Sequence, residues 1–422
     1  MLLRELRDFA KQEFGIELEV AVSSPGRLDF LNTHQDYKGL PVVSVGVNLR
    51  MYMGGKVRQD KVIRIASKNL KEEGVEYRDE FDIDHVELQG GRWFGDYLRG
   101  AIIALREKGY KLHGMDVVIR SEIPIGGGLG SSGAFTVAFI GLLNEAFNLG
   151  MTKSEIAELA YIAEHDIMGI PCGRLDQYGS AYGGVVRIEV KPPFRVEEIP
   201  FREGTFVVLD SGIKHSTADI HPRRQADIDE GLRILMSMPD IPADLRIKLG
   251  FKYYEPRWEE ITEEELAPYL MQLPENPAKR ILYTIKAHRS TELALRVMRG
   301  EKPSFEEALR VLGENWRSRL SEVYEAEGTE WKLRFVGLIM NQQHEMLMDL
   351  YDLSLPELER IRDGALRAGA LGVKLSGAGL GGALIALARD EVEGRKVLEA
   401  GLEAGASRGW VVRIDEGLRR EL

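Results

Sequence analysis

The sequence has one cysteine, no long apolar run and no excess of positive charge, and each shortage excludes a class of protein. Because Cys172 stands alone, no disulfide can form within the chain, which is typical of a reducing compartment. No stretch approaches the roughly 18 uninterrupted apolar residues of a membrane-spanning helix. The first residues mix charges of both signs, unlike a signal peptide. We therefore expect a cytoplasmic protein without a membrane partner.

The charge balance is acidic, with 56 Lys and Arg residues against 67 Asp and Glu residues and a formal net charge of −11. Such a chain has no general electrostatic attraction for nucleic acid, although a locally positive pocket could still bind an anion such as ATP. The 422 residues, of which 44% are hydrophobic and 29% charged, fit a globular enzyme of two or three domains.

Strand-like and helix-like segments alternate in the first half of the chain. Their composition and periodicity predict strands at 41–49, 62–66, 115–123, 183–190 and 205–209, and helices at 93–107, 131–148 and 152–166. Two further patterns, Thr152–Glu155 and Ser354–Glu357, are typical of capping boxes at helix starts.

After about residue 223 the sequence pattern predicts charged amphipathic helices, which continue to about residue 348. Strands are predicted again at 373–376, 383–388 and 410–414. We therefore expect α+β structure in both halves, with domains at 1–203 and 204–422 and a cleft between them.

A glycine-rich loop, Pro124-Ile-Gly-Gly-Gly-Leu-Gly-Ser-Ser-Gly-Ala134, follows a predicted strand and opens a predicted helix. Glycines let the backbone approach phosphate oxygens, and a helix start offers free N–H groups to an anion. No Gly-Lys-Ser/Thr follows, so the loop is not a Walker A motif, and the acidic residue of a dinucleotide fingerprint is absent. The alternative is a flexible turn without a ligand.

A second glycine cluster, Lys374-Leu-Ser-Gly-Ala-Gly-Leu-Gly-Gly-Ala383, lies between two predicted strands. Taken alone it could be a glycine hairpin. A polar segment near the N-terminus, Gly26-Arg-Leu-Asp-Phe-Leu-Asn-Thr-His-Gln-Asp-Tyr-Lys-Gly39, offers donors and acceptors for a polyhydroxyl ligand, and its alternative is a solvated loop.

These motifs together resemble the GHMP kinases, the family of galacto-, homoserine, mevalonate and phosphomevalonate kinases. The two glycine clusters resemble the second and third motifs of that family, in the family's order. Segment 26–39 resembles the galactokinase signature Gly-Arg-Val-Asn-Leu-Ile-Gly-Glu-His-Thr-Asp-Tyr-Asn-Gly, and Glu164–Tyr178 resembles a galactokinase stretch that ends in Cys-Gly-Ile-Met-Asp-Gln. The resemblance implies the GHMP fold, with an N-terminal domain like ribosomal protein S5 domain 2 and a C-terminal ferredoxin-like α+β domain.

The resemblance also implies roles at the phosphate end of a site. Asp176 matches the catalytic base beside the sugar C1 hydroxyl, Arg27 the arginine near the transferred phosphoryl group, and Glu164 with Ser132 the ligands of Mg²⁺. Arg27 would also keep Asp176 ionised. Trp93 matches a tryptophan near adenine, although a core tryptophan is an equal alternative. The residues implied to wrap the ATP phosphates are Gly126, Gly127, Gly128, Leu129, Gly130, Ser131, Ser132, Gly133 and Ala134.

At the sugar end, His34 and Asp36 match sugar-contacting residues, and Gly377 and Gly379 belong to the loop that closes on the substrate. Thr33 stands where galactokinases carry a glutamate that hydrogen-bonds a sugar hydroxyl near C6. Arg174 stands where they carry an apolar residue. The two departures make a uronic acid a candidate substrate, while the alternative for Arg174 is a salt-bridged or surface arginine.

Two other regions match the family less closely. His215-Ser216 followed by Arg223-Arg224 resembles a galactokinase segment, but its sugar-contacting tyrosine has only His221 as a nearby counterpart. The chain between residues 300 and 341 is longer than is typical of the family.

The sequence thus predicts an ATP- and Mg²⁺-dependent kinase that phosphorylates the anomeric hydroxyl of a monosaccharide. Galactose is the default substrate, and galacturonate or another galactose-like sugar is the alternative. A non-catalytic sugar sensor is the alternative from another class, although such proteins tend to lose residues of the glycine loop. We expect a monomer or homodimer.

Overall fold

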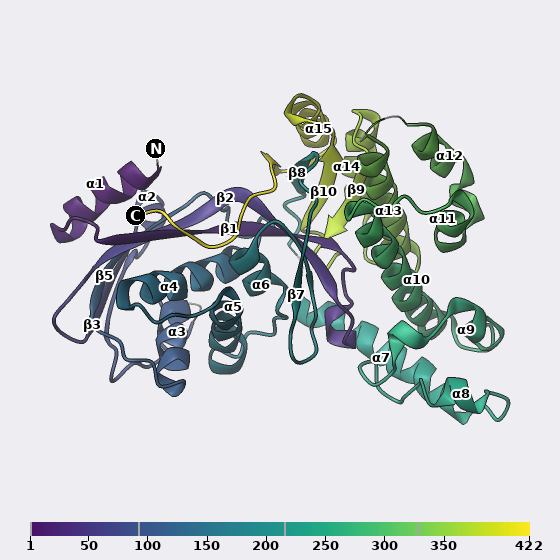
Figure 1. Ribbon diagram of the computed structural model, residues 1–422, viewed down its shortest axis with the longest axis horizontal. Helices are drawn as coiled ribbons and strands as arrows, with labels where there is room; N and C mark the ends of the chain where they lie inside the picture. Colours follow the sequence, from purple (N-terminus) through teal and green to yellow (C-terminus); the bar gives the residue numbers. More distant parts are fainter. Residues whose placement is uncertain (1, 92, 215–216, 327, 329) are drawn as a thin grey trace. The chain divides into compact units, whose positions relative to one another are not determined.

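The computed structural model describes residues 2–91, 93–214, 217–326, 328 and 330–422 (Figure 1). Its backbone divides into two compact units, the first made of residues up to 28, 44–186 and 414–422, and the second of residues 29–43 and 187–413. The chain passes between these units more than once, whereas the sequence predicts one boundary near residue 203. That boundary stays a prediction. His215 and Ser216, which the sequence comparison singled out, lie outside the described residues.

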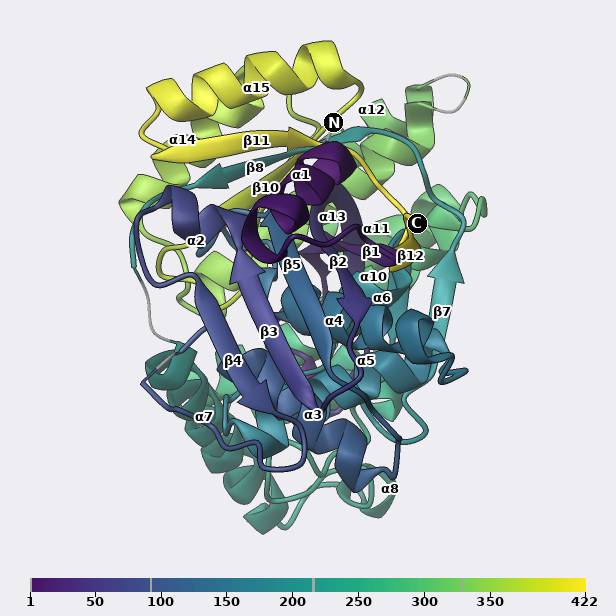
Figure 2. The same ribbon diagram turned by 90° about the vertical axis from the view of Figure 1, so that its left-hand side faces the viewer.

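The first unit contains a mixed sheet with the strand order β12-β1-β2-β5-β3-β4, to which β6 is added beside β2 (Figure 2). Strands β3 and β5 are parallel, and β2 and β5 are antiparallel. The strands are β1 (Val20–Leu31), β2 (Val42–Val57), β3 (Val62–Ser67), β4 (Arg78–Asp82), β5 (Met115–Ser121), β6 (Val185–Ile188) and β12 (Arg419–Arg420).

Helices cover both faces of this sheet. Helix α1 lies on one face, where Leu6 and Phe9 pack against Val118 of β5, and α3 to α6 lie on the other face (Figures 1 and 2). The helices of this unit are α1 (Leu2–Phe14), α2 (Lys68–Glu72), α3 (Asp96–Glu107), α4 (Ser131–Phe147), α5 (Lys153–Ile162) and α6 (Leu175–Tyr182). Helix α4 contacts α3, α5 and α6, and this explains why its sequence has no polar face.

The second unit contains an antiparallel sheet with the order β11-β8-β10-β9, on which α14 and α15 pack, while α13 packs along β9. The strands of this sheet are β8 (Thr205–Asp210), β9 (Gly372–Ser376), β10 (Ala383–Ala388) and β11 (Arg408–Val412), whereas β7 (Val196–Ile199) pairs with β6. The helices of this unit are α7 (Thr217–Ser237), α8 (Ala243–Arg246), α9 (Glu263–Leu270), α10 (Glu275–Met298), α11 (Phe305–Leu312), α12 (Arg317–Glu325), α13 (Glu330–Asp349), α14 (Pro356–Arg367) and α15 (Glu391–Glu403). No helix among the described residues is both long and apolar enough to cross a membrane.

Of the two predicted capping boxes, the structure confirms one. The capping box at Thr152 and Glu155 is confirmed, because each side chain bonds the backbone N–H of the other. The one at Ser354 is wrong, because α14 has Leu355 at its N-cap without a side-chain bond, and the Ser354 hydroxyl donates instead to Glu359. Strand β1 went unrecognised because polar Ser, Arg and Asp side chains interrupt its apolar residues, although nearly the whole strand is buried.

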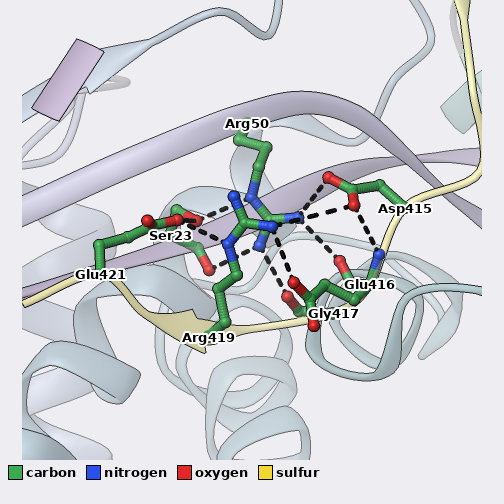
Figure 3. A network of polar contacts seen from close by, with 7 residues as sticks. All are labelled: Ser23, Arg50, Asp415, Glu416, Gly417, Arg419 and Glu421. Carbon is green, nitrogen blue, oxygen red and sulfur yellow. Dashed lines mark hydrogen bonds and ion pairs between the residues drawn. The ribbon is translucent and has the colours of Figure 1, made fainter. Parts of the chain in front are cut away.

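A polar network fixes the end of the chain in the first unit. Arg50, whose side chain is buried in β2, points its guanidinium toward the C-terminal segment (Figure 3). It donates to the Ser23 hydroxyl and carbonyl, to the Asp415 carboxylate, and to the carbonyls of Glu416 and Gly417. All five of its N–H groups therefore have acceptors, and β12 pairs with β1 beside them.

Candidate active site

The glycine loop borders a cavity of about 450 Å³ in the first unit. The loop contributes Gly126, Gly128, Leu129, Gly130, Ser131 and Ser132 to its lining, whereas Gly127, Gly133 and Ala134 do not line it. The walls are mainly apolar, with Leu70, Phe94, Tyr97 and Phe135 among them. A cavity that joins an apolar wall to a helix N-terminus can hold a ligand with a flat ring and an anionic end.

The backbone of the loop depends on glycine at two points. Gly130, directly before α4, has φ +66°, and a Cβ there would lie 3.0 Å from the Arg27 side chain. A Cβ on Gly133, in the first turn of α4, would lie 2.7 Å from Cβ of Asp176. These glycines therefore let α4 begin close to both charged residues.

An ion pair between Arg27 and Asp176 lines the same cavity. The Arg27 Nε donates to Oδ1 of Asp176 at 2.8 Å, and its Nη2 lies 2.6 Å from the same oxygen. Its Nη1 donates to the carbonyl of Gly128 at 2.8 Å. Arg27 thus holds both the carboxylate and the glycine loop, and Asp176 is placed by the first turn of α6.

Glu164 lies deeper, on a single π-helical turn that follows α5, a feature that is frequent at functional sites. The residue is 2% exposed, and its Oε1 has no hydrogen-bond partner among the described residues. Burial raises the pKa of Glu164 to about 7, while the side chains of Gln177, Thr136 and Ser132 oppose this rise. A buried carboxylate with an unpaired oxygen beside Ser132 fits the hard cation that the sequence implies.

Trp93, the predicted adenine contact, does not line the cavity, although two of its neighbours do. The Trp93 ring packs against Phe94 at a tilt of 55°, with ring centroids 4.6 Å apart, and Phe94 and Tyr97, not Trp93, line the cavity. A contact between Trp93 and a nucleotide stays a prediction.

Arg174 is held within the protein. Its Nε and Nη2 donate to the two carboxylate oxygens of Glu158 at 2.9 and 2.8 Å, and its guanidinium lies 3.9 Å from the ring centroid of Tyr161. The Tyr178 hydroxyl donates to Glu158 as well. This bidentate, stacked pair supports the salt-bridged alternative for Arg174 over an acidic-sugar contact.

The predicted sugar segment begins within β1, and from residue 29 onward it belongs to the second unit, where most of its polar groups are engaged. The Thr33 hydroxyl donates to Asp29 at 3.0 Å and accepts from Nζ of Lys374 at 2.6 Å. Burial lowers the pKa of His34 well below its usual value, so the ring is neutral at pH 7. Because its Nε2 lies 2.9 Å from the carbonyl of Ala378, that nitrogen carries the proton, and Nδ1 accepts from the Tyr37 hydroxyl.

Asp36 is the remaining predicted sugar contact. It opens the short helical turn 36–38 and is only partly buried. Burial raises the pKa of Asp36 to about 6, and the charge of Asp29 acts in the same direction. Unlike Thr33 and His34, its carboxylate has no side-chain donor in the described part of the chain, which leaves acceptor capacity for hydroxyl groups.

The C-terminal glycine loop connects to this segment. Gly377 and Gly379 both have φ near +90°, and the Gly377 N–H donates to Oδ2 of Asp29 at 3.2 Å. Sequence reasoning missed Asp29 and Lys374. A signal existed for Asp29, because the galactokinase signature has asparagine at that position.

Comparisons with known proteins match three parts of the chain to family descriptions. The family descriptions that match are "GHMP kinases N terminal domain" at residues 96–184, "GHMP kinases C terminal" at 333–407 and "Galactokinase galactose-binding signature" at 9–57. A galactokinase of Chloroflexus aggregans is 30% identical over 402 residues, which cover 94% of this chain and 89% of that protein. A galactokinase of Thermococcus kodakarensis is 29% identical over 385 residues, which cover 90% of this chain and 93% of that protein.

Solved structures share the fold. The Lactococcus lactis galactokinase crystallised with galactose has a TM-score of 0.76 at 24% identity, with 99% of this chain and all of that chain covered. The Methanococcus jannaschii mevalonate kinase has a TM-score of 0.60 at 18% identity, with 94% and 98% covered. The predicted GHMP kinase fold, with its two-domain mixture of helices and sheets, is therefore confirmed.

Proposed function

The chain belongs to the galactokinase family of GHMP kinases, and we propose that it transfers the γ-phosphoryl group of ATP to the anomeric hydroxyl of a monosaccharide, with galactose as the default substrate. One observation carries the proposal. The Arg27–Asp176 ion pair lines the same cavity as the glycine loop, so that a proton acceptor and a phosphate-binding helix start share one site. Phosphoryl transfer needs mainly this kind of positioning and charge neutralisation.

Mg²⁺ would be held by Glu164 and Ser132. Among the described residues no group of three or more His, Cys, Asp or Glu side chains could bind a metal by itself. This suits Mg²⁺, which is often bound through one or two protein oxygens and the phosphates of its nucleotide. When bound, the ion would neutralise charge on the transferred phosphoryl group. The unpaired Oε1 of Glu164 supports this assignment.

Asp176 would accept the proton of the attacking hydroxyl, and Arg27 would orient it. Both Nε and Nη2 of Arg27 approach Oδ1 of Asp176, which leaves Oδ2 available for a substrate hydroxyl. The positive charge of Arg27 also favours anionic oxygens on the group being transferred. The bond from Arg27 to Gly128 joins this pair to the loop at a fixed distance.

A neutral sugar fits the described residues better than a uronic acid. Arg174 is bidentately paired with Glu158, and Lys374 is buried against Thr33. Neither cation is therefore open to a sugar carboxylate. The sensor alternative has no support, because Ser131, Ser132, Gly133 and Ala134 are all present together with Arg27 and Asp176.

ADP release tests the proposal. Purified protein with ATP and Mg²⁺ would be given galactose, galacturonate, glucuronate, arabinose, fucose and N-acetylgalactosamine, and the product would be identified by phosphorus NMR. We expect turnover with galactose, or with a neutral relative of it, to give a sugar 1-phosphate. Asp176→Asn should lower kcat by at least about a hundredfold while nucleotide binding persists.

Three outcomes would contradict the proposal. Phosphate found elsewhere than at C1 would exclude the anomeric reaction. Turnover of galacturonate alone would establish the uronic acid alternative. Tight sugar binding without turnover of any sugar would favour the sensor.

A further inference from the structure

Three buried side chains in the second unit form a continuous hydrogen-bonded relay. Asp29, Thr33 and Lys374 are 6%, 2% and 0% exposed. The Lys374 ammonium donates to the Thr33 hydroxyl at 2.6 Å, and that hydroxyl donates to Oδ1 of Asp29 at 3.0 Å. The second oxygen of Asp29 accepts from the N–H of Gly377 at 3.2 Å. The relay therefore runs from β9 through the sugar segment to the first glycine of the C-terminal loop.

The charges in this relay compensate each other. A buried ammonium or carboxylate is costly unless it is paired or hydrogen-bonded. Lys374 also donates to the carbonyl of Leu375 at 2.6 Å. Burial lowers the pKa of Lys374 to about 8, and the negative charge of Asp29 opposes that change. Each charge in the relay thus stabilises the other, with the Thr33 hydroxyl between them.

The hydroxyl of Thr33 has no hydrogen left for a ligand. A hydroxyl has one donor, and that donor is used for Asp29. The surrounding backbone is also held, because the Tyr283 hydroxyl donates to the carbonyl of Thr33 at 2.7 Å. One residue further on, His34 donates to the carbonyl of Ala378. The sugar segment and the C-terminal loop are therefore joined directly at two points, Asp29 to Gly377 and His34 to Ala378.

We propose that Asp29 and Lys374 are positioning residues, which act through the Thr33 hydroxyl to hold the sugar segment against the backbone at Gly377. On this view Thr33 orders the site without contacting the sugar, and Asp36 is the carboxylate that meets sugar hydroxyls. The kinetic part of the inference rests on the proposed function, since it assumes that the sugar binds at this segment.

A matched pair of variants separates the hydroxyl from the bulk of the side chain. Thr33→Val keeps the shape and removes the hydroxyl, whereas Thr33→Ser keeps the hydroxyl. We expect Thr33→Val to raise the sugar KM about tenfold, the cost of losing a buried charge-assisted hydrogen bond, and Thr33→Ser to restore it. The ATP KM should change by less than about twofold, because the glycine loop and its cavity belong to the first unit.

Thr205→Val is the control for a general loss of stability. Thr205 is a buried threonine in the same unit. It pairs with Ala388 at one end of β10, whereas the other end of β10, at Ala383, pairs with Ser376 beside the loop. This variant should leave the sugar KM unchanged. If Thr33→Val and Thr205→Val have equal effects on the sugar KM, or if Thr33→Ser fails to restore it, the inference is overturned.

Hydrogen exchange at Gly377 tests the relay without any substrate. Asp29→Asn replaces one of two acceptor oxygens by a donor, so the Gly377 N–H and the Thr33 hydroxyl compete for the one that remains. We expect the Gly377 amide to exchange about tenfold faster in Asp29→Asn and Lys374→Met than in the unchanged protein. Unchanged exchange in both would overturn the inference, whether or not any sugar is phosphorylated. If no sugar is turned over but exchange rises as expected, the proposed function fails and the relay stands.

Discussion

At the scale of single residues, the three carboxylates of the candidate site lie in two kinds of environment. Asp176 is paired with Arg27, while Glu164 and Asp36 are raised in pKa, to about 7 and about 6, chiefly by burial. The first arrangement favours a charged group that is already oriented. The other two leave an acidic oxygen open to a ligand, which we propose to be a cation at Glu164 and sugar hydroxyls at Asp36.

The raised pKa of Asp36 predicts a pH dependence of sugar binding. If ionised Asp36 accepts hydrogen bonds from the sugar, protonation below pH about 6 removes an acceptor. We expect the sugar KM to rise as the pH falls below 6, approaching about tenfold per pH unit well below that value. Steady-state kinetics from pH 5 to 8 would measure this, with the ATP KM recorded alongside.

Asp36→Asn supplies the control for this prediction. This variant should have a high sugar KM at every pH, without the further rise below pH 6 that is expected of the unchanged protein. The effect of pH on stability has the opposite sign to its effect on sugar binding. The pKa of Asp36 in the folded protein lies above its ordinary value of 3.8, so the folded state binds the proton more tightly than the unfolded state. Between pH about 4 and 6 the contribution of Asp36 to the free energy of unfolding therefore decreases as the pH rises. A sugar KM independent of pH in the unchanged protein would contradict the assigned role.

At the scale of elements, the packing of α4 against α6 sets the position of Asp176. The two helices are in contact, and Gly133 allows them to approach without a side chain between them. A glycine in a helix costs about 1 kcal/mol relative to alanine, so its presence in the first turn of α4 reflects this close approach. The position of Asp176 thus depends on the absence of a side chain at Gly133.

Gly133→Ala should therefore lower kcat by more than its loss of stability alone would explain. Its Cβ would meet Cβ of Asp176 at 2.7 Å, so α6 must shift and the carboxylate with it. We expect a stability loss of about 1–3 kcal/mol and a fall in kcat of at least about tenfold. Gly364→Ala is the matched control, because its Cβ would meet Cβ of Ala404, also at 2.7 Å, away from the site in the second unit. Equal losses of kcat in both variants would argue against the local explanation.

At the scale of the whole molecule, the last residues of the chain complete the first unit. Residues 414–422 belong with residues up to 28 and 44–186, and β12 adds to the sheet at β1, the strand that carries Arg27. The buried guanidinium of Arg50 holds this segment by side-chain and backbone acceptors (Figure 3). The last nine residues are thus part of the structure that supports the site.

Arg50→Lys tests this role. Lysine keeps the charge but has three donors in place of five, so some of the carbonyls of Ser23, Glu416 and Gly417 lose their partner. We expect a loss of about 3 kcal/mol in the free energy of unfolding and faster exchange of the Glu421 amide, which donates to Ala21. Urea denaturation and hydrogen exchange would measure the two effects. Arg420→Lys, at an exposed position of the same segment, should change stability by less than about 0.5 kcal/mol.

The sequence predicted local features well, because short-range physics determines them. The start of α4 after the glycines, the capping box at Thr152 and the charged helices between 223 and 348 depend on neighbouring residues. Motif order was enough to indicate the family. The capping box at Ser354 failed because Glu359, not Glu357, takes the serine hydroxyl, and a local pattern cannot reveal that competition.

The sequence by itself therefore determined the family fold, the glycine loop at the start of α4 and the residue types of the candidate site. Only the tertiary structure decided which polar groups are open to a ligand. Arg174 is paired with Glu158 from the preceding helix, and Thr33 bonds to Lys374, which lies 341 residues later in the chain. The physical reason is that a hydroxyl or a charge has few bonding positions, and burial fills them with whichever partner folding brings near.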